Sequence, residues 1–197
     1  MKGYYKLRKQ ILKILENKLS KDLHYHGVHH TLDALETSDK YLRHIKIDPE
    51  DAKLLRLGIL FHDIGFTETT VDHEKKGAEI AQKILKEYNF DQKSINTITN
   101  LILATEIPQH PQTLLEQIIC DVDLDYLGRP DFYKISDSLF EELKVLVGLK
   151  DKNEWNKIQI RFLEKHQYHT EFAIKNRQPE KEKRIAELKN MIVEKNI

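Results

Sequence analysis

The sequence predicts an all-α protein, and three observations lead to that prediction. Apolar residues recur three and four positions apart along most of the chain, which is the period of an amphipathic helix. Aspartate precedes several of these apolar runs, where its carboxylate can cap a helix. The one alternating stretch, residues 158–162, lies between helical patterns and is therefore interpreted as helix rather than strand.

Helices account for most of the first half of the chain. In the N-terminal segment Leu7, Ile11 and Leu15 share one face, which can be buried. Residues 54–61 are apolar almost all round, which is typical of a helix at the centre of a fold, and Gly65 is expected to end that helix. The predicted helices lie within 1–20, over 26–42, from Asp48-Pro49 to 61, after Asp72 and after Asp91.

Four further helices are predicted in the second half. Pro108 and Pro111 bracket a short loop before the first of them. The charged segment after Arg177 is interpreted as an amphipathic helix packed on the rest, although a mobile extension would have the same composition. These helices are expected at 114–124, 131–147, 151–166 and 179–193, which gives about eight or nine in all.

Length and charge limit the kinds of function. A chain of 197 residues can bury one core but is short for two ordinary domains, so one domain is expected over 1–197. Its core is expected at about 22–150, with helices of 151–197 packed on it. Lys and Arg number 32, as do Asp and Glu, so no basic stripe for long nucleic acid is expected. A small anionic ligand stays compatible, because a local metal ion can supply positive charge.

The cysteine content suits a reducing compartment. Cys120 is the single cysteine, so neither an intrachain disulfide nor a thiolate metal cage can form, and a cytoplasmic location is expected. The N-terminal segment lacks the unbroken apolar core of a signal peptide, and no later segment resembles a membrane-spanning run. No membrane partner is expected, whereas a homodimer is compatible with the sequence. The ten histidines are therefore the residues to examine for chemistry.

The strongest local signal is His62-Asp63, at the end of the most apolar predicted helix. Burying an imidazole beside a carboxylate is costly unless each finds a partner. Taken alone, the pair could be an ordinary helix-terminal histidine and a capping aspartate. Upstream, however, His26 and His30 are four residues apart and are expected on one helical face, with His29 pointing elsewhere.

A second signal is the acidic segment that contains Asp121, Asp123 and Asp125. Carboxylates this close repel each other unless a cation or hydrogen bonds compensate. A solvated helix end is the alternative, but the apolar residues 118–120 argue against full exposure. Two histidines and two aspartates from three helices would suit one divalent ion, Mn, Fe, Co, Zn or Mg, with positions left for water.

The order of these residues resembles the H…HD…D signature of the HD superfamily of metal-dependent phosphohydrolases. The matching residues are His30, His62-Asp63 and Asp123. The segment around His26 also looks like the corresponding stretch of the cyclic-nucleotide phosphodiesterases, which have a related helical core. A bacterial group of predicted HD-superfamily phosphohydrolases shows similar segments at 102–105, 121–128 and 155–170, so the resemblance covers roughly 25–177.

The resemblance implies that His30, His62, Asp63 and Asp123 are the metal ligands. Asp123 is preferred to Asp121, because the family's ligand is the aspartate directly before a leucine. Asp121 would then act as a cap or support a ligand indirectly, although it stays an alternative ligand. The fold implied is a single HD-domain-like helical bundle.

Two further histidines acquire roles from the resemblance. His26 falls where the phosphodiesterases place the histidine that protonates the leaving group. His73 matches a position that in related proteins contacts a second metal ion or the phosphate. Two-metal members carry another histidine after the helix that here ends at 105–106, so one ion is expected, with His110 as an alternative contributor to a second site.

The function implied is hydrolysis of a phosphoester of a small molecule, a nucleotide being favoured, by metal-activated water. Asp63 would orient the water, and His26 or His73 would protonate the departing oxygen. The alternatives are a phosphodiesterase acting on a cyclic nucleotide or other diester, and a metal-stabilised regulatory module without turnover. Arg129 could contact a phosphate but is more simply a surface arginine, and Trp155 is interpreted as a packing residue.

Overall fold

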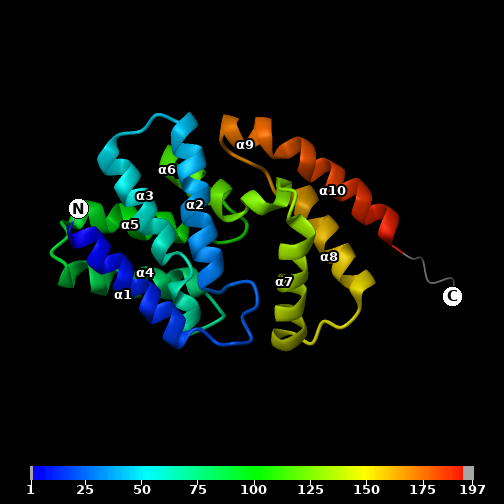
Figure 1. Ribbon diagram of the computed structural model, residues 1–197, viewed down its shortest axis with the longest axis horizontal. Coiled ribbons are helices and arrows are strands. Elements are labelled where there is room, and N and C mark those ends of the chain that lie inside the picture. The colour runs from blue at the N-terminus through cyan, green and yellow to red at the C-terminus, as the bar shows by residue number, and fades with distance from the viewer. Residues whose placement is uncertain (1, 193–197) are drawn as a thin grey trace.

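The computed structural model describes residues 2–192, with side chains for residues 4–192. All regular secondary structure in this part of the chain is helical (Figure 1). The expected fold class is confirmed, with ten α-helices and two short 3-10 helices in the described residues. The elements are α1 Lys2–Lys18, α2 Val28–His44, α3 Pro49–Phe61, η1 Ile64–Thr67, α4 His73–Glu87, α5 Gln92–Leu103, α6 Leu114–Asp123, η2 Asp125–Gly128, α7 Phe132–Leu146, α8 Lys152–Lys165, α9 Glu171–Asn176 and α10 Gln178–Met191.

Several predicted bounds need correction. The number of helices exceeds the expected eight or nine because α9 is a separate short helix, capped by the side chain of Thr170. α2 begins at Val28 after an extended Gly27, so His26 lies before the helix and not on its face. The last predicted helix was expected to reach Val193, which lies outside the described residues, as do residues 1 and 194–197.

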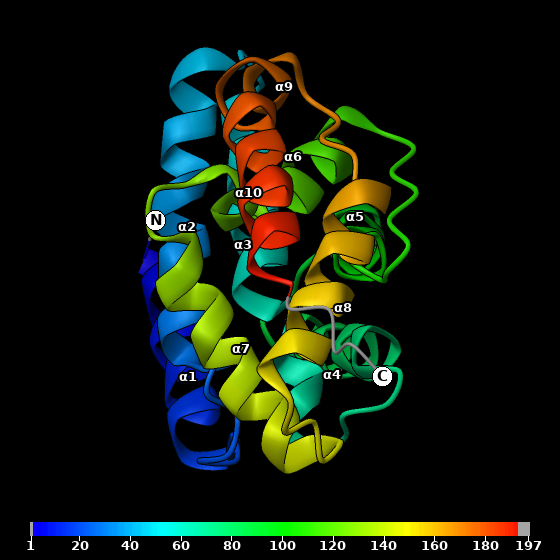
Figure 2. The ribbon, with the colours of Figure 1, turned by 90° about the vertical axis from the view of Figure 1, so that its right-hand side faces the viewer.

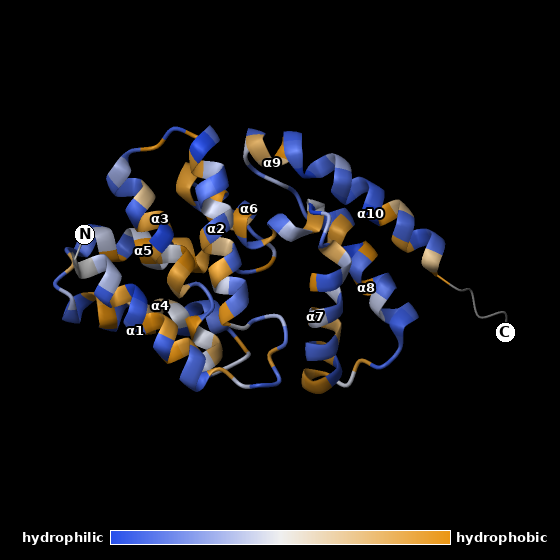
Figure 3. Ribbon diagram, in the orientation of Figure 1, coloured by the Kyte–Doolittle hydropathy of each residue, from blue (hydrophilic) through white to orange (hydrophobic). Residues whose placement is uncertain are grey.

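The central helix is α3, which packs against α1, α2, α5 and α6. Its residues Leu55, Leu57, Leu60 and Phe61 are buried, and in Figure 3 the end of α3 that leads to the site is largely hydrophobic. In Figures 1 and 2 helices α1–α6 form one part of the molecule, and α7–α10 lie beside it. No helix within residues 2–192 is both long and apolar enough to cross a membrane.

Local capping explains where several helices begin. The carboxylate of Asp48 accepts from the backbone N–H of Glu50, and that of Asp91 from Ser94, as expected of N-cap residues. Asp72 differs from the prediction, because it has left-handed backbone angles and makes no side-chain cap. Its carboxylate instead accepts from the ammonium group of Lys75.

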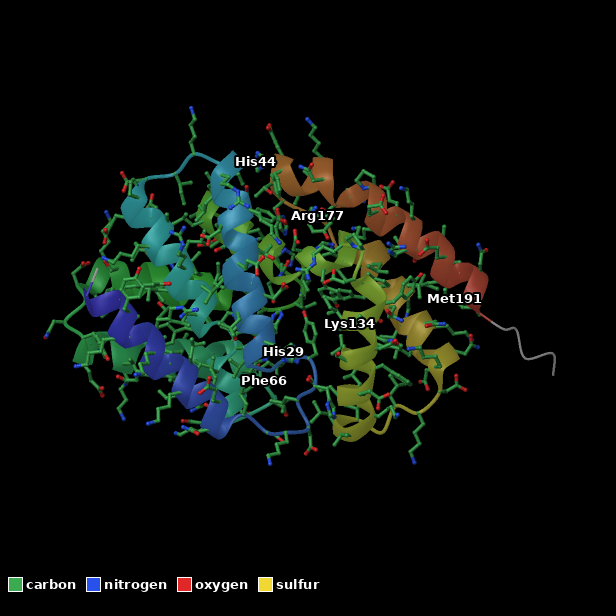
Figure 4. The ribbon with its side chains drawn as sticks, in the orientation of Figure 1. His29, His44, Phe66, Lys134, Arg177 and Met191 are labelled. Atoms are coloured by element: carbon green, nitrogen blue, oxygen red, sulfur yellow. The ribbon has the colours of Figure 1, made fainter. Side chains whose placement is uncertain are left out.

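A buried polar group attaches the C-terminal helices to the rest. Asp125, only 1% exposed, accepts from the hydroxyl of Tyr41 at 2.8 Å and from Nε of Arg177 at 2.7 Å. Arg177, labelled in Figure 4, lies between α9 and α10. A Cβ atom at Gly128 would lie 2.3 Å from the carbonyl oxygen of Arg177, so this close approach of the two backbone segments needs a glycine. The junction of α9 and α10 therefore rests directly on η2.

Gly65 serves a similar purpose on the opposite side of the fold. The sequence predicted that it ends the central helix, but α3 ends at Phe61 and Gly65 lies in η1. A Cβ atom there would lie 1.9 Å from the carbonyl oxygen of His73 and 2.9 Å from the backbone nitrogen of Gly77. Only glycine lets η1 contact the first turn of α4, and that contact fixes where His73 begins its helix.

We expect Gly65→Ala to lower the free energy of unfolding by about 1 to 3 kcal/mol, because the added methyl forces two backbone segments apart. Thermal unfolding followed by circular dichroism measures the change. Gly77→Ala is the matched control, since its Cβ would meet its nearest atom at 3.4 Å and alanine favours a helix. Equal melting temperatures for the two variants would contradict the close-contact role of Gly65.

Candidate metal centre

Three segments that are distant in sequence bring two histidines and two aspartates together. His30 lies in the first turn of α2, His62 and Asp63 follow α3, and Asp123 is the last residue of α6. Nε2 of His30 lies 3.1 Å from Nε2 of His62 and 3.0 Å from Oδ1 of Asp123. These three residues form the only group of this kind in the described residues that could hold a metal ion.

Asp63 adds a second carboxylate to this group. Its Oδ2 lies 3.3 Å from Nε2 of His62 and 3.6 Å from Nε2 of His30. This oxygen is buried, yet no group in the described part of the chain donates a hydrogen bond to it. Because an unpaired buried carboxylate oxygen is costly, the site favours a cation beside it.

The separations between these donor atoms fit one ion. Ligands at about 2.0 to 2.2 Å from a metal lie roughly 2.8 to 3.6 Å from their neighbours in octahedral or tetrahedral geometry. The nitrogen–nitrogen and nitrogen–oxygen separations of the group run from 3.0 to 3.6 Å. Nδ1 of His62 donates to the carbonyl oxygen of Ile59 at 2.7 Å, which leaves the lone pair of Nε2 facing the group. Nitrogen and oxygen donors together suit a divalent transition metal.

The charges of the group are strongly interdependent. Burial alone would lower the pKa of His62, but Asp63 and Asp123 raise it well above its usual value. Burial would raise the pKa of each aspartate, but the two histidines hold both well below the usual range. A divalent cation neutralises the same carboxylates by displacing the imidazole proton, so metal binding should be stronger at neutral than at acid pH.

His26 is held at the edge of this group by Glu142 of α7. Nδ1 of His26 lies 2.5 Å from Oε1 of Glu142, whose Oε2 accepts from the backbone N–H groups of Tyr25 and His26 at 2.8 and 3.0 Å. Glu142 is 1% exposed. The buried carboxylate of Glu142 thus fixes both the backbone before α2 and the imidazole ring of His26. Sequence reasoning missed Glu142, since nothing in the pattern around it marks a residue that acts 116 positions away.

Phe66 separates His26 from His73. Its ring stacks on His26 at a centroid distance of 4.4 Å and on His73 at 3.9 Å. Nε2 of His73 lies 3.3 Å from Oε1 of Glu74 and 3.8 Å from Oδ1 of Asp63. His73 therefore adjoins the group without being among its closest donors. No signal in the sequence had indicated Phe66, which Figure 4 labels near the start of α2.

The pKa values of these two histidines move in opposite directions. Burial lowers the pKa of His73 to about 4, although Asp63 opposes that shift. Burial also acts to lower the pKa of His26, but the hydrogen bond that its ring donates to Glu142 and the charges of the nearby aspartates outweigh burial and raise the pKa. Near neutral pH His73 is thus uncharged, while His26 retains its proton to higher pH than a free histidine.

The other candidates lie elsewhere. Asp121 accepts from the backbone N–H groups of His169 and Thr170 at 2.8 Å each, and from the Thr170 hydroxyl at 2.6 Å. It is completely buried and supports the segment before α9 rather than the donor group. His29 and His110 are exposed. Outside the site, Arg129 pairs with Asp33 and Asp131.

The donor group opens into a cavity of about 290 Å³. His26, Asp63, His73 and Asp123 line it, as expected for residues of one site, and Trp155 lines it as well. The sequence had assigned Trp155 to packing, and the ring does stack on Phe140 at a centroid distance of 6.0 Å. Its position shows that α8 forms part of the cavity wall.

Comparison with known families agrees with this geometry. The model of the HD domain matches residues 27–125, half of the chain. The matched segment contains His30, His62-Asp63, His73 and Asp123, but neither His26 nor Glu142. No curated protein and no solved structure matches the chain.

The two neighbouring aspartates of α6 should respond differently to loss of charge. Asp123→Asn should weaken metal binding at least tenfold, because it removes a charged donor from the group, whereas Asp121→Asn should leave metal binding nearly unchanged. Asp121→Asn should instead lower the free energy of unfolding by about 1 to 3 kcal/mol, because its amide would face hydrogen-bond donors. Titration calorimetry with Mn²⁺ and thermal unfolding measure the two effects. The opposite pattern would make Asp121 the ligand.

Proposed function

The chain belongs to the HD-domain family, and on that premise we propose that it is a divalent-metal-dependent phosphohydrolase that cleaves a phosphoester of a small molecule. The observation that carries the proposal is the convergence of His30, His62, Asp63 and Asp123 at donor separations of 3.0 to 3.6 Å. The unpartnered Oδ2 of Asp63 supports it, since a cation would satisfy that atom. Only the family resemblance, and no feature of the site, favours a nucleotide as the substrate.

These four residues would hold one divalent ion, Mn, Fe, Co, Zn or Mg. Such an ion supplies a Lewis acid that lowers the pKa of water and offsets the charge of a phosphoryl group. The bond from His62 to the carbonyl of Ile59 keeps that imidazole oriented toward the ion. Oδ1 of Asp63, which lies 3.8 Å from Nε2 of His73, would orient the attacking water.

His26 is the group best placed to donate a proton to the leaving oxygen. Glu142 occupies its Nδ1, so the proton available for transfer is on Nε2. The raised pKa of His26 lets it hold that proton to higher pH than a free histidine, whereas His73, with a pKa of about 4, is a neutral imidazole near neutral pH and a much weaker acid. Of the two acids that the sequence allowed, the electrostatics therefore favour His26. His73 orients the substrate as a neutral hydrogen-bonding group.

Phosphate release from a panel of esters tests the proposal. The purified chain should bind about one Mn²⁺, Co²⁺, Mg²⁺ or Zn²⁺, lose activity with a chelator and regain it when the ion is restored. Asp63→Ala should abolish both metal binding and turnover. The panel should contain nucleoside monophosphates, aryl and alkyl monoesters, and a diester. Stoichiometric metal binding without turnover of any ester would instead indicate a regulatory binding module.

His26→Ala should retain the metal ion but lose about 10²- to 10⁴-fold in kcat, as expected for loss of a general acid.

Glu142→Gln should act through His26. Activity that depends on a protonated acid falls as pH rises through its pKa, and Glu142 raises that pKa. The variant should therefore lose activity at lower pH than the wild type. An unchanged pH–rate profile would exclude this role for the Glu142–His26 pair.

A further inference from the structure

The cavity beside the metal centre is apolar over most of its wall. α7 contributes Leu139 and Leu143, and α8 contributes Trp155, Ile158 and Phe162. All five residues lie beyond the segment that matches the HD domain. Contact with these side chains would therefore stabilise the apolar part of a bound molecule and would not stabilise polar groups.

The charged groups of the wall limit the charge of the ligand. Among the described residues that line the cavity there is no lysine or arginine. Three carboxylates line it instead, those of Asp63, Glu74 and Asp123. Positive charge is available only from His26 and from an ion held at the donor group. One phosphoryl group can be neutralised there, whereas a further phosphate would be buried against apolar side chains without a partner.

Two polar side chains of the apolar wall, Gln159 and Thr105, are already paired within the protein. Oε1 of Gln159 accepts from the hydroxyl of Ser136 at 2.5 Å, and its Nε2 donates to Asn156 at 3.3 Å. The hydroxyl of Thr105 donates to the carbonyl oxygen of Ile102 at 2.8 Å. The hydroxyls of a sugar would find few free partners here, and their burial would be unfavourable.

Besides Oδ2 of Asp63, two buried polar groups of the cavity wall have no partner among the described residues, the hydroxyl of Tyr25 and the indole N–H of Trp155. Trp155 is 4% exposed and lines the cavity. Indole N–H groups donate only, and buried ones usually find a partner. An acceptor atom on a bound molecule would satisfy this donor.

We propose that the substrate carries a single phosphoryl group on an apolar body, which packs against the indole of Trp155. This inference rests on the proposed phosphohydrolase function and specifies its substrate class. Aryl and alkyl phosphoesters belong to this class, whereas nucleotides, with their hydroxyl-bearing ribose, do not. The donor group and His26 hold the phosphoryl end, and α7 and α8 enclose the apolar body.

Binding can be measured without turnover. Trp155 is the single tryptophan of the chain, so intrinsic fluorescence reports occupancy of the cavity directly. The Mg²⁺-loaded full chain is titrated with ethyl-, butyl- and hexylphosphonate, whose carbon–phosphorus bond is not hydrolysed. Each added methylene should lower Kd about three- to fourfold. A Kd that does not depend on chain length, or a fluorescence that none of the three probes changes, would overturn the inference.

Kinetics separates this inference from the proposed function. Hexyl and 1-naphthyl phosphate should be hydrolysed with kcat/KM at least tenfold above that of glycerol phosphate, AMP or ATP. Hydrolysis of AMP or glycerol phosphate in preference to the apolar esters would overturn the substrate class while the phosphohydrolase assignment stands. Absence of hydrolysis for every ester would overturn the assignment itself, and the phosphonate titration would still report on the cavity.

Two variants of α7 locate the effect. Leu143→Arg places a cation in the cavity wall and should lower kcat/KM for hexyl phosphate at least tenfold. Val145→Arg is the matched control, because Val145 is 55% exposed and does not line the cavity. Melting temperatures show whether both variants fold. If Leu143→Arg does not fold, the alkylphosphonate series measured on the wild-type protein decides the question. If both variants fold, equal kcat/KM values for hexyl phosphate would overturn the inference.

Discussion

The burial of two carboxylates beside two imidazoles is the constraint on which the rest of this structure depends. Asp63 and Asp123 lie against His30 and His62, with little access to water. Such a group is stable only when positive charge is shared among its members, through protons or through a metal ion. Three helices must end or begin at one point to form it, and the apolar α3 at the centre of the fold makes that convergence possible.

The molecule divides its tasks between two regions. The segment that matches the HD domain, residues 27–125, contains the donor group and His73. The helices after it provide Glu142, which holds His26, and the apolar wall of the cavity. The proposed metal chemistry and the proposed substrate preference would therefore depend on different parts of the chain, so the second could change while the first is kept.

The acidic segment at the end of α6 and the start of η2 illustrates how position decides the role of a residue. Asp121 accepts three hydrogen bonds from the segment before α9, Asp123 faces the two histidines, and Asp125 binds Tyr41 and Arg177. The like charges that repel each other on a short stretch of chain are directed to three separate sets of partners. Two of these sets fasten the C-terminal helices to the core.

The sequence by itself determined the helical fold and the residue types of the site, because helix periodicity, capping and a buried His-Asp pair are local properties of the chain. Family resemblance then indicated which residues should meet. Only the tertiary structure decided that Glu142 holds His26, that Phe66 separates the two outer histidines and that Trp155 faces a cavity. Several of these relations join residues tens of positions apart, and no local pattern encodes contacts that arise when helices pack.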